Sequence, residues 1–166
     1  MIEIDRLSTR FAVRRMGDAD ADAILRLCRG NVQYYRYCGA EATREQILND
    51  LHITPPGTAL SAKYYLGFYE GEALVAVMDL IDGYPEPDIA FIGFFMLDIA
   101  CQGRLIGSSI IGEAAACLKA AGKSAVMLGI DKDNPQSTYF WKKNGFRVLR
   151  EPDRDGWTVL VAEKRL

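Results

Sequence analysis

The most constraining feature of this sequence is the run from Ile89 to Asp98, which is apolar on both faces of a strand. Apolar side chains fill both alternating sets of positions, with Phe91, Phe95 and Leu97 in one set and Ile92, Phe94 and Met96 in the other. A strand at a solvated sheet surface would instead alternate between apolar and polar residues, because one of its faces meets water. We therefore expect this strand at the centre of a sheet, with other elements covering both of its sides.

The regions on either side of this run predict a mixture of strands and helices. The expected strands are Phe11–Arg15, Tyr64–Tyr69, Ala73–Asp82, Ala125–Ile130, Phe146–Arg150 and Trp157–Glu163. The expected helices follow Asp20 and Thr43 and span Val32–Cys38, Gly103–Ala121 and Pro135–Asn144. Because short turns separate the strands between Tyr64 and Asp98, these strands are expected to form an antiparallel meander. The element order indicates an α/β (α+β) fold, with a mixed, mostly antiparallel central sheet and helices on both faces.

Length and charge limit the classes of protein to which the chain belongs. With 166 residues, no repeats and no long linker, it is expected to form a single domain over residues 1–166. Its formal net charge of −2 argues against nucleic acid as a partner, because binding to a duplex depends on neutralising many phosphates. The most apolar stretch, Ala73 to Ile81, is too short to cross a bilayer, so we expect no membrane partner.

The spacing of the cysteines bears on metal binding and disulfides, and the N-terminal residues bear on the cellular location. Four cysteines occur without a CxxC pair or a regular spacing: Cys28, Cys38, Cys101 and Cys117. Zinc sites and disulfide frameworks depend on such spacings, so we expect no metal and reduced thiols. The acids Glu3 and Asp5 lie where a secretory signal would carry a basic stretch before an apolar run. These features predict a cytoplasmic location.

The segment from Phe95 to Ser109 reads as a strand that passes through a short loop into a helix rich in small residues. The first N–H groups of a helix have no partner within it, and together with the positive end of the helix dipole they attract phosphate. Gly103 and Gly107 would let a ligand or the neighbouring backbone come close. The alternative is that these two glycines only ease the packing of the helix against the sheet.

Two motifs in this part of the chain resemble signatures of the GNAT family of N-acetyltransferases. The first, [Gln/Arg]xxGx[Gly/Ala] after a central strand, corresponds to the stretch from Gln102 to Gly107. The second, an asparagine before a helix that ends in aromatic-aromatic-x-Lys-x-Gly-Phe, corresponds to Asn134 to Phe146. The family's element order also matches over residues 11–165. The resemblance therefore covers nearly the whole chain and implies one acyl-CoA N-acyltransferase domain.

The resemblance implies acetyl-CoA as the acyl donor, bound without a metal where two neighbouring strands splay apart. The backbone of Phe95, Met96 and Leu97 would pair with the pantetheine arm as an added strand would. The stretch implied to hold the pyrophosphate consists of Gln102, Gly103, Arg104, Leu105, Ile106, Gly107 and Ser108. Asn134 would form a hydrogen bond with the pantetheine or acyl region. Lys143 would meet a phosphate, and a solvated surface lysine is the alternative.

Two residues depart from the family pattern. Leu105 replaces the first glycine of the first motif, which is tolerable if this residue has a helical φ. Trp141 stands where the family's usual general acid is a tyrosine, and an indole N–H cannot protonate a leaving thiolate as a phenol can. Ser137 shares a helix face with Trp141, and our hypothesis is that it orients a water there.

The reaction also needs a base and a pocket for the acceptor. Asp79, Asp82 and Asp98 are the candidates for the base, and a solvated carboxylate at a strand end is the alternative for each. Tyr34 and Tyr35 fall where the family places its substrate-side helices, so they are candidate acceptor contacts together with Asp82. An aromatic core cluster is the alternative for the two tyrosines.

On this resemblance the chain is an acyltransferase that moves an acetyl group from acetyl-CoA to a primary amine of a small molecule or peptide. The amine would attack directly in a ternary complex, and the expected catalytic residues are Asn134, Trp141 and Asp79. The alternative is a non-catalytic acyl-CoA-binding sensor or regulatory module with the same fold, because Trp141 replaces the acid. A homodimer is left open, since members of the family are often dimers.

Overall fold

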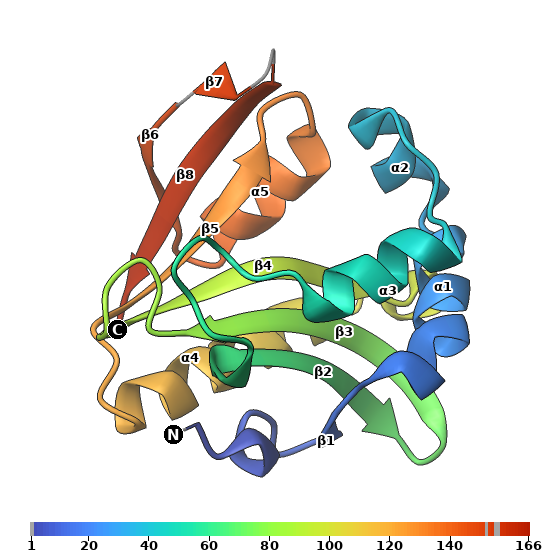
Figure 1. Ribbon diagram of the computed structural model, residues 1–166, viewed down its shortest axis with the longest axis horizontal. Coiled ribbons are helices and arrows are strands. Elements are labelled where there is room, and N and C mark those ends of the chain that lie inside the picture. The colour runs from blue at the N-terminus through green and yellow to red at the C-terminus, as the bar shows by residue number, and fades with distance from the viewer. Residues whose placement is uncertain (1, 152, 155–156) are drawn as a thin grey trace.

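The computed structural model describes residues 2–151, 153–154 and 157–166, and an eight-stranded sheet lies at its centre (Figure 1). The strands are β1 (Ala12–Arg15), β2 (Lys63–Glu70), β3 (Ala73–Asp82), β4 (Ile89–Leu97), β5 (Ala125–Asp131), β6 (Arg147–Arg150), β7 (Asp153–Arg154) and β8 (Trp157–Arg165). They lie in the order β1-β2-β3-β4-β5-β8-β6, with β7 paired to β8 outside this row. Every pair is antiparallel except β4 with β5, which is parallel. The predicted mixed, mostly antiparallel sheet is confirmed.

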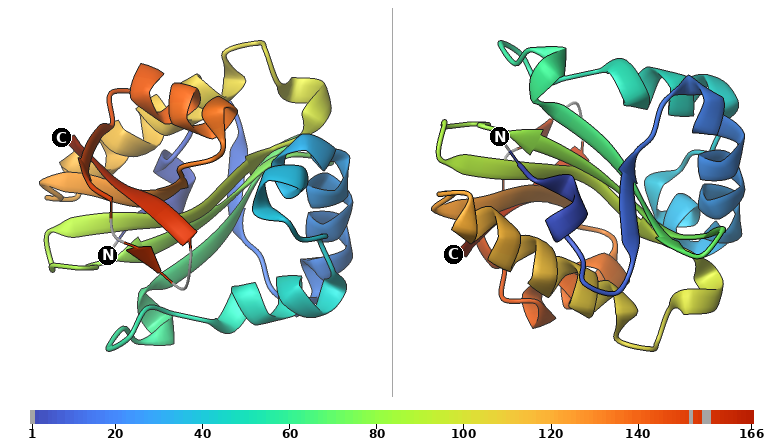
Figure 2. Two further views of the ribbon diagram at one scale, coloured as in Figure 1. Left: turned by 90° about the horizontal axis from the view of Figure 1, so that it is seen from above. Right: turned by 90° about the horizontal axis from the view of Figure 1, so that it is seen from below.

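Helices cover both faces of this sheet, as the two views of Figure 2 show. The helices are α1 (Ala21–Gly30), α2 (Val32–Cys38), α3 (Arg44–His52), α4 (Ile106–Ala120) and α5 (Pro135–Lys143). One core packs α1 and α3 against the sheet and includes Ile24, Ile47 and Val77. The other packs α4 and α5 against the opposite face and includes Ile110 and Trp141. The expectation of helices on both faces is therefore confirmed.

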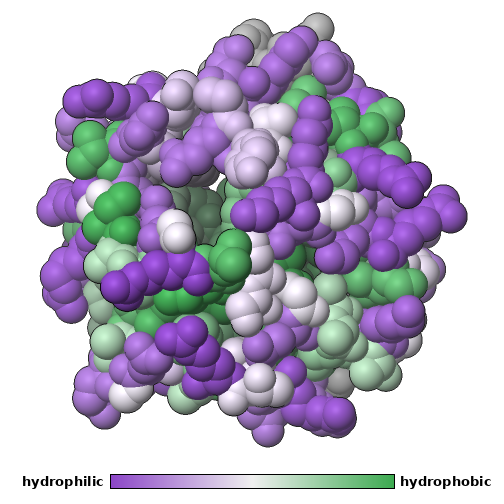
Figure 3. Space-filling view, turned by 180° about the vertical axis from the view of Figure 1, so that it is seen from behind, coloured by the Kyte–Doolittle hydropathy of each residue, from purple (hydrophilic) through white to green (hydrophobic). Residues whose placement is uncertain are grey.

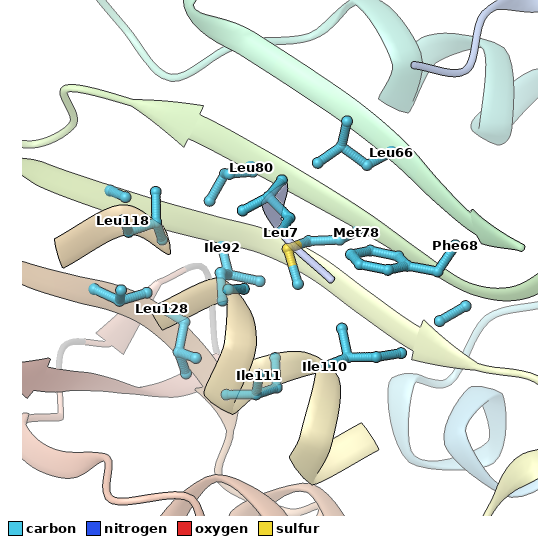
Figure 4. Packing of buried hydrophobic residues seen from close by; sticks show 14 of the residues in the cluster. Leu7, Leu66, Phe68, Met78, Leu80, Ile92, Ile110, Ile111, Leu118 and Leu128 are labelled. Atoms are coloured by element: carbon cyan, nitrogen blue, oxygen red, sulfur yellow. The ribbon is translucent and has the colours of Figure 1, made fainter. Parts of the chain in front are cut away.

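The larger core lies between α4 and the central strands (Figure 4). Side chains of α4 meet those of the strands there, and the most deeply buried of them are Ile110, Ile111 and Leu118 from the helix and Phe68, Met78, Leu80 and Leu128 from the strands. Each such side chain contributes roughly 1.5–3 kcal/mol by leaving water. This burial fixes α4 along the sheet and so sets where its first turn lies.

A bulge in β4 changes the two faces predicted for that strand. Ile92 pairs with Leu80 and Phe94 pairs with Asp79, so Gly93 is an extra residue on the β4 side. One extra residue shifts every later side chain to the opposite face of a strand. Ile92 and Met96, expected on the same face, therefore lie in different cores. The prediction that β4 is covered on both sides is confirmed.

Most predicted elements are present, but the helix expected from Gly103 begins at Ile106. Gly103 and Leu105 have φ angles of +72° and +61°, and this left-handed backbone cannot belong to a right-handed helix. The helix expected after Thr43 is present as α3, and Thr43 caps it, since its Oγ1 accepts a hydrogen bond from Gln46 N at 3.2 Å. Within the described part of the chain, no helix combines the length and apolar character needed to span a membrane.

Candidate active site

A cleft opens where β4 and β5 diverge. The two strands pair only from Ile89 to Ile92 and from Ala125 to Leu128, which leaves the segment from Gly93 to Leu97 unpaired toward β5. A cavity of about 330 Å³ lies at this divergence, between the end of β4, the start of α4 and α5. Seen from behind, the molecular surface is hollowed, and apolar side chains form the floor of the hollow (Figure 3).

The cleft brings together nearly all the residues predicted to hold the cofactor. It is lined by Phe95, Met96, Leu97, Gln102, Gly103, Leu105, Ile106, Gly107, Ser108, Asn134 and Lys143. Arg104 is exposed and does not line it. Trp141, Tyr34 and Ser137 also face the cavity. Four further residues that were not among the predicted site residues also line the cleft, namely Asn31, Gln136, Tyr139 and Phe140.

The free edge of β4 offers backbone groups to a ligand. Asp98 N donates to Val75 O on β3 at 2.8 Å, and in an antiparallel ladder alternate residues point the other way. Phe95 and Leu97 therefore direct their N–H and C=O groups toward the cleft. The carbonyl of Leu97 is already engaged, because it accepts from Asn31 Nδ2 at 3.1 Å and from Gln102 Nε2 at 3.4 Å.

The loop between β4 and α4 contains a strained residue. Leu105 has a φ of +61°, and no other non-glycine residue in the described ranges has a positive φ. The condition set from the sequence, a helical φ at Leu105, is therefore not met. This left-handed residue is the N-cap of α4, and its carbonyl accepts a hydrogen bond from Ser109 N at 2.9 Å. The backbone thus keeps the conformation that favours glycine at a position occupied by leucine.

Gly103 in this loop and Gly107 in the first turn of α4 are glycines for different physical reasons. Gly103 has a φ of +72°, and a Cβ there would meet no atom within 4 Å, so conformation rather than space calls for glycine. A Cβ at Gly107 would lie 3.2 Å from the Phe140 ring and 3.7 Å from that of Phe95. Gly107 therefore allows α4 to approach the aromatic wall of the cleft.

That wall comes from α5, whose start is fixed by a cap. Asn134 is 2% exposed, and its Oδ1 accepts a hydrogen bond from Ser137 N at 3.0 Å. Trp141 is buried among phenyl rings, with centroid separations of 6.0 Å to Phe95, 5.0 Å to Phe140 and 5.1 Å to Phe146. These contacts hold the indole in place as part of the cleft wall.

Asp79 lies outside the cleft lining, in a buried ion pair. Lys63 Nζ donates to Asp79 Oδ2 at 2.7 Å, and the two side chains are only 2% and 13% exposed. Burial raises the pKa of Asp79, although the neighbouring Lys63 acts in the opposite direction. A Cβ at Gly93 would lie 2.7 Å from Asp79 Oδ2, so the missing side chain of Gly93 leaves room for this carboxylate.

The structure does not bring Asp82, Asp98 or Tyr35 into the cleft lining. Asp82 pairs with Lys123 at the far end of β3, opposite the start of β4. Asp98 Oδ1 accepts from Ala100 N at 2.8 Å and caps a short 3-10 turn. Tyr35 packs against the core beneath α1 and α3, and burial raises the pKa of Tyr35.

Tyr34 differs from Tyr35 because its ring faces the cavity. Its ring packs edge-on against Phe94 of β4, with the centroids 6.0 Å apart. Burial raises the pKa of Tyr34, so its phenol keeps its proton at neutral pH.

No group of three or more His, Cys, Asp or Glu side chains placed to hold a metal occurs among the described residues.

Asn31 is the functional candidate that sequence reasoning missed. It is 4% exposed, lines the cleft and bonds to both β4 and Gln102. The sequence offers one local signal, because asparagine is favoured where a helix ends, and here it stands between two helical patterns. That signal predicts a helix boundary but not a contact with residues about 70 positions away.

Comparison with protein families identifies one match. The sequence model of the acetyltransferase (GNAT) family matches residues 25–146. This range includes most of α1, all of the cleft-lining residues and both sequence motifs up to Phe146. No curated protein matches the chain.

Solved structures share the whole fold at low sequence identity. An acetyltransferase from Thermus thermophilus is 22% identical, with a TM-score of 0.79 over 94% of this chain and 97% of that one. The PaiA N-acetyltransferase from Thermoplasma acidophilum, in complex with coenzyme A, is 19% identical, with a TM-score of 0.66 over 94% and 99%. A chimera of the spermidine N-acetyltransferase SpeG from Vibrio cholerae and hSSAT is 14% identical, with a TM-score of 0.66 over 95% and 96%.

Proposed function

Because the chain belongs to the GNAT family of acetyltransferases, we propose that it transfers an acetyl group from acetyl-CoA to a primary amine of a small molecule or peptide. The amine would attack directly in a ternary complex. The observation that carries this proposal is the cleft at the divergence of β4 and β5, because it combines a free strand edge with the N-terminus of α4. Acetyl-CoA supplies the acyl group as a thioester, and the chain supplies binding, orientation and hydrogen-bond donors.

The residues of the cleft fit an elongated, anionic cofactor. The N–H of Leu97 and the N–H and C=O of Phe95 are in place to pair with the amides of a pantetheine arm, as an added strand would. The backbone N–H groups from Gly103 to Ser108 and the positive end of the α4 dipole are suited to a pyrophosphate. The prediction that all three residues pair with the arm is too broad, because Met96 directs its N–H and C=O toward β3 and Leu97 O is engaged by Asn31.

The remaining polar groups of the cleft suit the reacting end. Because Oδ1 of Asn134 caps α5, the group that this side chain offers to the pantetheine or acyl region is its Nδ2 donor. Backbone N–H groups of β4 would stabilise the negative charge that develops on the carbonyl oxygen. We assign Tyr34 to the acceptor side of the cleft. Asp79 as general base stays a prediction, and its contact with Lys63 favours a structural ion pair.

The proposal is tested by coenzyme A binding and by thiol release. Isothermal titration should show one coenzyme A per chain. Release of free thiol from acetyl-CoA should then accelerate with at least one amine from a panel of polyamines, amino acids, aminoglycosides and peptide N-termini. Spermidine belongs in the panel because one protein of the same fold is named as a spermidine N-acetyltransferase. Absence of any coenzyme A binding would contradict the proposal.

A matched pair of glycine substitutions locates the binding site. Gly107→Ala should weaken coenzyme A binding, because the new Cβ would lie 3.2 Å from the Phe140 ring of the cleft. Gly112→Ala is made in the same helix, where a Cβ would meet nothing within 4 Å, and should leave binding unchanged. Equal effects of the two substitutions would argue against this cleft as the site.

A non-catalytic acyl-CoA-binding module is the second candidate, because Trp141 replaces the family's tyrosine and is packed among three phenyl rings. Trp141→Tyr restores a phenol, and Trp141→Phe is its matched control, because it removes the indole without adding a hydroxyl. If protonation limits a slow enzyme, the Tyr variant should release thiol faster than the Phe variant, by up to about 10²-fold. Tight binding without amine-dependent release in the wild type and both variants would favour the binding module.

The cytoplasmic location and the homodimer stay predictions.

A further inference from the structure

A single residue joins α1 to α2. The helix α1 ends at Gly30 and α2 begins at Val32, and Asn31 between them has φ −94° and ψ 55°, outside the helical region. Its N–H donates to Cys28 O at 2.9 Å, and its C=O accepts from Tyr35 N at 3.4 Å. The backbone of Asn31 therefore closes one helix and opens the next, so its placement sets the direction of α2.

The side chain of Asn31 ties this joint to the cofactor cleft. Its Nδ2 donates to Leu27 O at 3.0 Å and to Leu97 O at 3.1 Å, and its Oδ1 accepts from Gln102 Nε2 at 2.6 Å. Asn31 is only 4% exposed, so losing a partner would leave a polar group unsatisfied away from water. Both halves of the amide are satisfied, and the joint is fixed to Leu97 at the end of β4 and to Gln102 in the loop before α4.

Apart from Asn31 at its base, α2 is held by Tyr34 and Tyr35, which pack against the core beneath α1 and α3. The helix spans seven residues, from Val32 to Cys38, and none of them is fully buried. Figure 1 shows α2 beyond the end of α1. Elements with few buried contacts open most readily, so the placement of α2 is sensitive to the contact at its base. Tyr34, which lines the cleft, lies on this helix.

We propose that Asn31 and Gln102 are positioning residues that couple occupancy of the cofactor cleft to the order of α2. A ligand that forms hydrogen bonds with the backbone between Gln102 and Ser108 would hold Gln102 in place, and through Asn31 it would fix α2 and the Tyr34 side of the cleft. By linkage, an acceptor that orders α2 tightens the cofactor in turn. This inference rests on the proposed function, because it takes coenzyme A as the ligand of the cleft.

Hydrogen exchange with coenzyme A as the probe tests this coupling. In the wild type, saturating coenzyme A should slow exchange of the α2 amides by about fivefold or more, which is the lower end of typical coupling between sites. In Gln102→Leu, measured at its own saturating concentration of coenzyme A, the protection of α2 should be lost while that of the α4 N-terminus remains. Gln136→Leu is the matched control, because Gln136 lines the same cleft from α5, and it should keep α2 protection.

A double variant tests whether Asn31 and Gln102 act through their shared hydrogen bond. Asn31→Ala should abolish the same protection, and the double variant with Gln102→Leu should lose no more than either single variant, because both act through one contact. Unchanged α2 protection in Gln102→Leu, or equal loss in Gln136→Leu, would overturn the inference. Coenzyme A binding without any change at α2 in the wild type would overturn it and leave the proposed function intact. Absence of coenzyme A binding would overturn the proposed function itself.

Discussion

At the scale of single residues, Leu105 has a left-handed backbone conformation that its side chain makes unfavourable. A left-handed backbone costs a non-glycine residue roughly 1–2 kcal/mol, because its Cβ crowds the following carbonyl. Leu105 has this backbone and is 66% exposed, so its side chain gains little from burial. The fold keeps the conformation because the loop must turn from β4 into α4.

This strain predicts that Leu105→Gly is more stable than the wild type. Glycine removes the steric cost. Its greater conformational freedom in the unfolded chain reduces this gain in stability by up to about 1 kcal/mol. We expect a net rise in the free energy of unfolding of up to about 1 kcal/mol, measured by urea denaturation. Leu105→Ala keeps a Cβ and is the control. Equal stabilities of the Gly and Ala variants would show that the loop is not strained.

At the scale of elements, one carboxylate connects α4 to the segment before β1. Glu113 accepts hydrogen bonds from the backbone N–H of Thr9 and, at 3.2 Å, from the hydroxyl of Ser109. Desolvation alone would raise the pKa of Glu113, but these hydrogen bonds outweigh it, and the pKa is lowered from its ordinary value of 4.5. The contact therefore depends on the charged form.

The sign of this shift predicts how stability depends on pH. A carboxylate with a lowered pKa in the folded state stabilises that state above its ordinary pKa, and the contribution is lost as pH falls through the lower folded value. The stability difference between wild type and Glu113→Gln should thus be largest near neutral pH and shrink below pH 4.5. Ser109→Ala should reduce the difference partway, and urea titrations at several pH values would measure it. A difference that grows with acid would contradict the assignment.

How much the sequence could predict also depends on the element. Hydrophobic periodicity and capping residues such as Thr43 placed nearly every helix and strand, because these signals are local. The start of α4 was wrong by three residues, since nothing in the sequence indicates that Leu105 takes a left-handed backbone. The faces of β4 beyond Gly93 were exchanged because a bulge depends on the partner strand and on space for Asp79. The contact between Asn31 and Gln102 joins residues far apart in the chain, so local patterns cannot show it.

At the scale of the whole molecule, two cores share one sheet. The core beneath α4 and the core beneath α1 and α3 lie on opposite faces of the same strands, and β4 contributes to both. A central strand that is needed by both cores ties their stabilities together. We therefore propose that the chain folds as one domain, as its length and continuous pattern predict.

This sharing predicts one cooperative unfolding transition. Far-ultraviolet circular dichroism follows all helices and strands, and tryptophan fluorescence includes the signal of Trp141 in one core. The two signals should give coincident midpoints in urea, because the loss of β4 removes support from both cores. Midpoints that differ would show that the two faces unfold separately.

The divergence of β4 and β5 also bears on self-association. Unpaired strand edges are templates for aggregation, and the outer strands β1 and β6 are only four residues long, which limits pairing there. The longer unpaired edge, from Gly93 to Leu97, lies inside the sheet rather than at its margin. The side chains of Asn31 and Gln102 occupy the last carbonyl of that edge, at Leu97. The unpaired N–H and C=O groups of this edge therefore lie in a recess. A slender ligand can enter that recess more readily than a β-strand of a second copy of the chain can.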